Sequence, residues 1–188
     1  MKKNILKFIF SFFAITLFSI LGSKNVWADV SVYSNTYETD SGRVTYIETD
    51  EVVSHEEIAK IVEEQRQEVE QDMSASAISA SWYGLVRNGN TTNCELWFNF
   101  SGGIICSNLQ YSQIKVQNRS ILNRKTYKTF AADIKKFNAG MIKSVYIGAV
   151  SIPTSEKSAH IDATNVLLYS LSGGWISVWG SDSNPVIN

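Results

Sequence analysis

The chain has 188 residues and a formal net charge of −1, with 44% hydrophobic and 19% charged residues. If a short N-terminal leader were removed, the remaining chain would still be long enough for one ordinary domain. Its two histidines and two cysteines leave little material for a catalytic or metal site of those residues, and no Cys/His cluster has ligand spacing.

The first 28 residues have the layout of a secretory signal peptide. Lysines at positions 2, 3 and 7 precede a mostly apolar run from Phe8 to Leu21, and Val26 and Ala28 fit a cleavage site after Ala28. The run is shorter than the roughly 20 apolar residues of a spanning helix. We therefore expect residues 1–28 to be removed and the mature chain to be secreted and extracellular; an uncleaved anchor is the alternative. The lysine-led leader and the abundant Ile, Asn and Lys suggest a Gram-positive source.

Charge divides the expected mature chain into two regions. Residues 29–75 hold 13 acidic and three basic residues, a net charge of −10, whereas residues 76–188 hold five acidic and ten basic residues, a net charge of +5. Both cysteines and all tryptophans of the expected mature chain lie after residue 76. We therefore place a boundary near residue 76 and expect residues 29–75 to lie outside the β core.

The acidic region contains two predicted segments. Residues 29–53 are polar and poor in core-forming side chains, which predicts an extended or mobile segment. Residues 54–75 predict an acidic amphipathic helix, because Ser54 and Glu57 fit a capping box and the apolar residues fall on one narrow side. We expect this helix to rest weakly on the basic domain; a free spacer or a processed pro-segment is the alternative.

The basic region, residues 76–188, predicts a mainly β domain. Runs of period-two alternation are separated by the turn signals RNGN, SGG, NAG and a second SGG. Short strands with such turns predict an antiparallel β-sandwich or a small barrel. Residues 125–138 fit two patterns, a short helix lying across the sheet and a strand.

The two cysteines, Cys94 and Cys106, predict a disulfide because the chain is expected to be exported. A tight turn at Gly102 and Gly103 would set Cys94 opposite Tyr111, so the bridge needs a wider loop or a bulge. Two buried free thiols and a catalytic cysteine are the alternatives.

Aromatic residues give the best candidate contact surface. The alternation of their strands turns Trp97, Trp175 and Trp179 away from the apolar side, so we predict an exposed binding surface; the alternative is that another layer covers them.

The first hypothesis is a secreted, non-enzymatic recognition module, expected to be a monomer, that binds a cell-wall polymer, a glycan or a protein. The rival is a secreted bacteriocin-like or membrane-active effector, since residues 76–188 are net basic. We expect no catalytic residues, no cofactor, no metal and no nucleic-acid partner.

Overall fold

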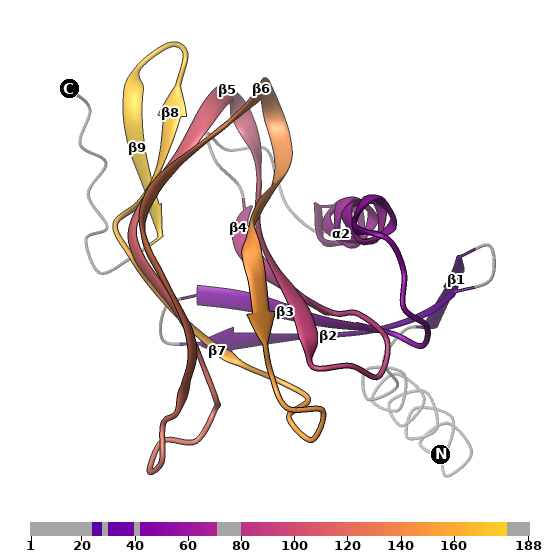
Figure 1. Ribbon diagram of the computed structural model, residues 1–188. Coiled ribbons are helices and arrows are strands. Elements are labelled where there is room, and N and C mark those ends of the chain that lie inside the picture. Colours follow the sequence, from indigo (N-terminus) through magenta and orange to yellow (C-terminus); the bar gives the residue numbers. More distant parts are fainter. Residues whose placement is uncertain (1–23, 28–29, 40–41, 71–79, 180–188) are drawn as a thin grey trace, which may run out of the picture.

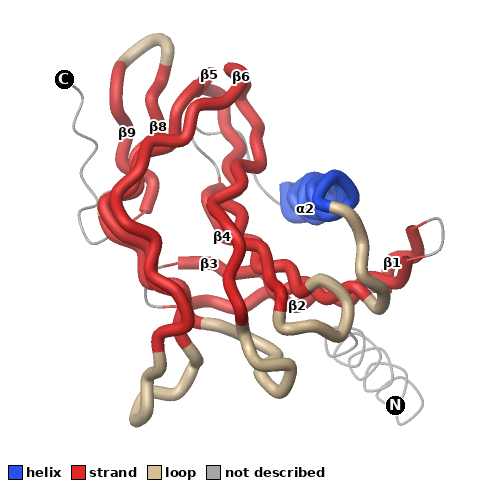
Figure 2. Tube along the Cα trace, in the orientation of Figure 1, coloured by secondary structure: helices blue, strands red, loops and turns tan. Residues whose placement is uncertain are grey.

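The computed structural model describes residues 24–27, 30–39, 42–70 and 80–179, and its elements are shown in Figures 1 and 2. The strands are β1 (Lys24–Trp27), β2 (Val30–Thr39), β3 (Gly42–Thr49), β4 (Ala80–Arg87), β5 (Asn93–Gln117), β6 (Thr126–Ser151), β7 (His160–Thr164), β8 (Val166–Ser170) and β9 (Gly174–Trp179). The helix is α2 (His55–Glu70).

The nine strands form one mixed, open sheet. The main path of the sheet runs β1-β2-β3-β4-β5-β8-β9, and β6 and β7 each pair with β5. Strands β3 and β4 are parallel, and the other pairs are antiparallel. The prediction of a mainly β protein is confirmed. An antiparallel sandwich or small barrel is not confirmed, because the sheet is open and contains a parallel pair.

A long hairpin of β5 and β6 organises the molecule (Figure 1). Its register runs from Asn93 opposite Ser151 to Gln117 opposite Thr126. The other side of β5 pairs with β4 near its start and with β8 and β7 near its end. Strand β5 is therefore central along most of its length, whereas β6 pairs only with β5 among the described residues.

The Gly102–Gly103 step does not turn the chain back. These glycines lie within β5, where the register against β6 shifts between Ser101 and Cys106. A glycine inside a strand often marks a bulge or a bend. The strand therefore continues through this step, and its partner is the distant β6.

The segment 125–138, for which a short helix was one prediction, is a strand. Residues Lys128–Lys136 of β6 stand opposite Val116–Asn108 of β5 in regular antiparallel register. The aromatic residues have a spacing typical of a helix, but the segment pairs with β5 as a strand. This pairing brings Tyr127, Phe130 and Phe137 against the main core. Tertiary pairing overrides a local preference in this way because strand stability depends on cross-strand contacts.

The acidic region contributes to the sheet and to the core, unlike the prediction that it lies outside. Strands β2 and β3 form within residues 29–53, and β3 pairs with β4 across the boundary expected near residue 76. Helix α2 packs on the sheet over a second apolar cluster, which is separate from the main core. This second cluster consists of Val32, Ile47, Ile58, Ile61, Val62, Val86 and Trp97.

The predicted signal peptide, residues 1–28, lies largely outside the described residues. Strand β1, which pairs with β2, belongs to this leader and would leave with it. Within the part of the chain that the structure describes, no helix has the length and apolar character needed to span a bilayer.

Candidate functional site

The loop at the tip of the β5–β6 hairpin, residues 118–125, is held in shape by its own hydrogen bonds. The backbone N–H of Asn118 donates to the carbonyl of Lys125 at 3.0 Å, and the Asn118 side chain accepts from the Lys125 N–H at 2.8 Å. The same side chain donates to the carbonyl of Asn123 at 3.0 Å, and Ser120 Oγ accepts from the Asn123 N–H. The tip is therefore a structured loop held by internal hydrogen bonds.

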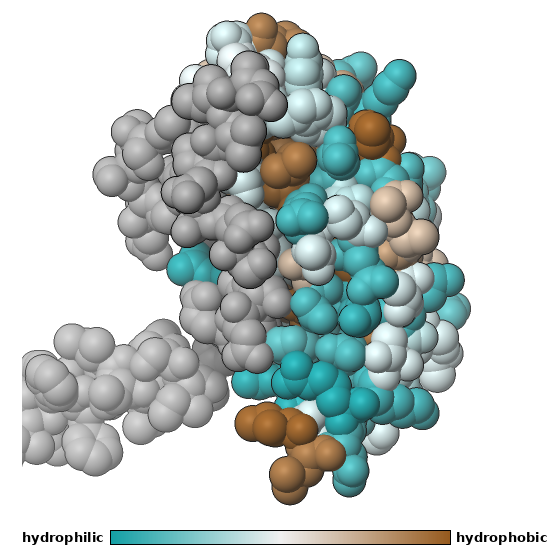
Figure 3. All heavy atoms as spheres, turned by 90° about the vertical axis from the view of Figure 1, so that its left-hand side faces the viewer, coloured by the Kyte–Doolittle hydropathy of each residue, from teal (hydrophilic) through white to brown (hydrophobic). Residues whose placement is uncertain are grey.

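Two large apolar side chains project from this tip. Ile121 is 87% exposed and Leu122 is 94% exposed, the highest values among the exposed large hydrophobic residues of the described chain. Figure 3 shows apolar side chains at the lowest point of the molecule, next to a hydrophilic surface. Neighbouring apolar side chains held this far from the core suit contact with an apolar partner.

Basic residues flank the apolar pair in the sequence. Residues 118–128 contain four cations and no acidic residue. Each cation lies near a ring: Arg119 is 4.5 Å from the Tyr37 ring centre, and an Arg124 nitrogen is 3.1 Å from Nε2 of His160. The two lysines are farther from the nearest ring centres: Lys125 Nζ is 5.9 Å from the Tyr127 ring, and Lys128 Nζ is 5.8 Å from the Phe130 ring.

The three tryptophans predicted to form a binding surface lie in different places. Trp97 is 5% exposed and belongs to the second apolar cluster under α2. Trp179 is buried in the main core with its ring edge-on to Tyr83, and Trp175 is half-buried against Tyr169. The structure therefore does not bring them together as one exposed face.

His55, at the start of α2, is partly exposed and contacts three residues of β5 and β6. Its Nδ1 lies 2.9 Å from Glu95 Oε2, which also accepts from Trp97 Nε1 at 3.1 Å. Its ring stacks on Trp97, with centres 5.3 Å apart, and meets the Tyr146 ring edge-on at 4.8 Å. These contacts fasten the first turn of α2 to β5 and β6.

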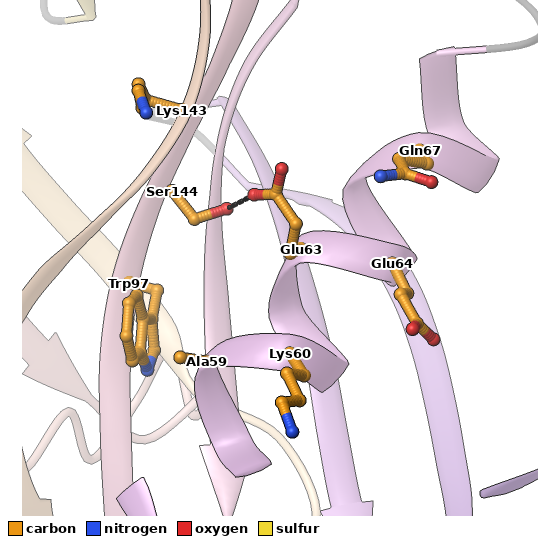
Figure 4. Close-up of a pocket in the computed structure, with 8 residues that line it drawn as sticks. All are labelled: Ala59, Lys60, Glu63, Glu64, Gln67, Trp97, Lys143 and Ser144. Atoms are coloured by element: carbon orange, nitrogen blue, oxygen red, sulfur yellow. Dashed lines mark hydrogen bonds between the residues drawn. The ribbon is translucent and has the colours of Figure 1, made fainter. Parts of the chain in front are cut away.

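A groove of about 460 Å³ runs between α2 and the hairpin (Figure 4). It is lined by Ala59, Lys60, Glu63, Glu64, Gln67, Trp97, Lys143 and Ser144. Its centre is occupied by an internal contact, because Ser144 Oγ donates to Glu63 Oε2 at 3.1 Å. The buried Trp97 ring already stacks on His55, so the groove has the shape of a site but offers little aromatic face for a ligand.

The predicted disulfide between Cys94 and Cys106 is not formed, and both cysteines are free and buried. The reason is that both lie on the same strand, twelve positions apart, which in a straight strand is about 40 Å. Burial raises the pKa of the Cys94 thiol to about 11, against an opposing effect of the Arg87 charge, and burial also raises the pKa of Cys106. Protonated, buried thiols are poor nucleophiles.

In the described part of the chain, the second histidine and the acidic residues do not assemble a metal site. His160 is buried at the start of β7, facing Arg124, while Asp162 lies near Lys115, with 4.0 Å between the charged atoms. Among the described residues, no group of three His, Cys, Asp or Glu side chains could hold a metal ion.

The sequence contained a signal for the tip that residue-by-residue pattern reading missed. The stretch NRSILNRK, residues 118–125, places an apolar pair between basic residues and turn-forming Asn and Ser. The pairing of β5 with β6 along their length is what shows that this stretch forms the loop at the tip of a hairpin.

Comparison with known proteins adds no assignment: no protein-family model, no curated protein and no solved structure matches this chain.

Proposed function

We propose that the protein is a secreted, non-enzymatic binding module that docks on anionic lipid surfaces through the β5–β6 hairpin tip. The observation that carries this proposal is the exposed pair Ile121 and Leu122, held by a hydrogen-bonded loop in a stretch of sequence with four basic residues. Of the ligand classes considered from the sequence, this surface favours the membrane over a cell-wall polymer, a glycan or a protein.

The apolar pair supplies the part of binding that does not depend on charge. Full burial of an Ile or Leu side chain contributes roughly 1.5–3 kcal/mol. Both side chains are almost completely exposed, so docking can remove nearly all of their apolar surface from water. The loop is already ordered by Asn118, which limits the conformational entropy lost on binding.

The basic residues supply an electrostatic contribution. A Lys or Arg near an anionic membrane surface contributes about 1 kcal/mol, and this contribution falls within a Debye length. Four basic residues flank the apolar pair in the sequence: Arg119, Arg124, Lys125 and Lys128. A neutral membrane would attract only the apolar pair. Apolar side chains combined with nearby Lys and Arg are typical of proteins that bind at the membrane interface.

A purified anionic polymer offers charge but no apolar phase. It would engage the basic residues and leave Ile121 and Leu122 in water. The two side chains therefore discriminate between lipid and polymer, and their substitution is the direct test.

The test is sedimentation of the secreted chain with phosphatidylglycerol vesicles, with phosphatidylcholine vesicles and with purified peptidoglycan. We expect binding to the anionic vesicles, and at least a tenfold weaker affinity for the Ile121→Ser/Leu122→Ser variant, since tenfold corresponds to about 1.4 kcal/mol. The Arg124→Gln/Lys125→Gln variant should bind more weakly at low salt and approach the parent protein at high salt.

The matched control is Leu171→Ser, which removes an exposed leucine from the turn between β8 and β9. This variant should bind as the parent protein does. Sedimentation with peptidoglycan alone, or vesicle binding that survives the double Ser substitution, contradicts the proposal.

A further inference from the structure

Strand β6 presents an exposed and open edge. From Thr126 to Ser144 no residue of β6 is buried. Among the described residues the strand pairs only with β5, so its outer edge carries backbone N–H and C=O groups without a strand partner. Proteins usually avoid so long an open edge, because it is a template for pairing with another strand.

The side chains along this edge are self-complementary. Asp133 and Lys135 form an ion pair on β6 with 2.8 Å between the charged atoms, and Ile134 between them is 48% exposed. An antiparallel copy centred on Ile134 sets Asp133 opposite the second copy's Lys135, and Lys135 opposite its Asp133. Opposite charges facing one another across strands are favourable, and like charges are unfavourable.

We propose that two copies of this chain pair through β6, antiparallel, with Ile134 of each copy on the two-fold axis. The occupant of the open edge is thus a second copy of the same strand. This inference goes beyond the proposed function and replaces the monomer expected from the sequence.

The charges select this register against its neighbours. In an antiparallel pair, opposite residues point to the same face, and successive residues point to opposite faces. A two-fold pairing must therefore centre on one residue. Centring on residue 133 sets Asp133 against itself, and centring on residues 135 or 136 sets Lys135 or Lys136 against itself. Centring on residue 132 sets Lys128 against Lys136, so only the Ile134 centre matches charges in this stretch.

Apolar residues also meet in the same register. Ile134 falls opposite Ile134 of the second copy, on the two-fold axis. Ile134 is 48% exposed in the single chain, so pairing would cover apolar surface as well as backbone. The axis reverses the strand direction, which places the two hairpin tips at opposite ends of the pair. If the proposed function holds, such a pair would bridge two surfaces.

The first experiment is disulfide trapping in solution, without lipid, so that its outcome is independent of the proposed function. Directly opposite residues have Cα atoms about 4.5–5.5 Å apart, within the range of a disulfide. We expect Ile134→Cys to give a covalent dimer on mild oxidation. Ala132→Cys, on the same face, would stand about 13 Å from its copy and should stay monomeric. The parent protein controls for the buried Cys94 and Cys106.

The second experiment exchanges the charges. Asp133→Lys and Lys135→Asp should each sediment as a monomer. In a dimer of two identical variant chains, residue 133 of one copy would lie opposite a residue 135 of the same charge in the other copy. Mixing the two variants, or combining both changes in one chain, should restore the dimer to the level of the parent protein.

A parent protein that stays monomeric at its highest soluble concentration overturns the inference. Equal trapping at positions 132 and 134 overturns the register. Failure of the mixed variants to associate, while circular dichroism shows both folded, overturns the charge argument.

Discussion

At the scale of single residues, Arg87 makes a dense set of polar contacts. Its side chain is fully buried, and its Nε donates to the Tyr46 hydroxyl at 2.6 Å. The two terminal nitrogens donate to the carbonyls of Thr91, Ile152, Pro153 and Glu156. All five N–H donors are thereby used, and the end of β4 is joined to the loop after β6. Burial raises the pKa of Tyr46 despite the opposing hydrogen bond from Arg87, so the hydroxyl stays neutral.

We predict that Arg87→Met lowers the free energy of unfolding by about 3 kcal/mol or more, because several buried acceptors lose their donors at once. Urea unfolding followed by tryptophan fluorescence measures this change. Lys115→Met, which removes a partly exposed cation at 4.0 Å from Asp162, should change the free energy by less than about 1 kcal/mol. Equal effects of the two substitutions would show that the Arg87 network contributes little.

At the scale of elements, α2 is held to the sheet by apolar and polar contacts together. Ile58, Ile61 and Val62 are buried against the second cluster. On the polar side, Glu63 accepts hydrogen bonds from Arg66 of its own helix and from Ser144 of β6. Burial alone would raise the pKa of Glu63, but the bonds from Arg66 and Ser144 and the nearby Lys143 outweigh burial and lower it.

This lowered pKa gives a pH-dependent prediction. A carboxylate whose pKa is lower in the folded state stabilises the fold above its unfolded pKa, about 4.3 for Glu, and loses this effect as the pH falls through the folded value. Glu63→Gln should therefore lower the melting temperature at pH 7, and the gap to the parent protein should narrow as the pH falls below about 4. Thermal melts across this range measure the gap.

The control for this prediction is Glu51→Gln, which makes the same change of charge in the loop before α2. It should leave the melting temperature near that of the parent protein. A gap for Glu63→Gln that is constant from pH 7 to pH 3 would contradict the ionised contact with Ser144 and Arg66.

At the scale of the whole molecule, the acidic and basic regions share one sheet. Strand β3 pairs with β4 in parallel register from Arg43 opposite Trp82 to Glu48 opposite Arg87. Tyr46 of β3 lies in the main core, and α2 covers Trp97 of β5. The regions are thus joined by backbone hydrogen bonds and buried apolar surface, and salt should have little effect on their union.

We predict that a chain starting at Ala75 shows no cooperative unfolding. It lacks β2, β3 and α2, so the edge of β4 and the apolar side of Val86 and Trp97 become exposed. A chain starting at Asp29, which lacks only the expected leader, should unfold cooperatively by circular dichroism. A chain from Ala75 that melts at the temperature of the chain from Asp29 would show that the acidic region is dispensable for the fold.

Several local features follow from the sequence alone, because the interacting residues are near neighbours. The capping box is one: Ser54 N–H donates to Glu57 Oε2 at 3.0 Å, and Glu57 N–H donates to Ser54 Oγ at 3.2 Å. The hairpin of β8 and β9 is another, with Gly174 at a positive φ of 83° where the turn meets β9. The mainly β character likewise follows from alternation within single strands.

Tertiary structure decided the features that join distant residues. Trp97 alternates as an outward residue, yet α2 covers it through His55, 42 positions earlier. The segment 125–138 has a helical spacing, yet β5 fixes it as a strand. Cys94 and Cys106 stay apart because β5 continues through the two glycines between them and does not turn back. In each case the deciding contact is a strand or helix pairing over long sequence separation, which periodicity within one segment does not encode.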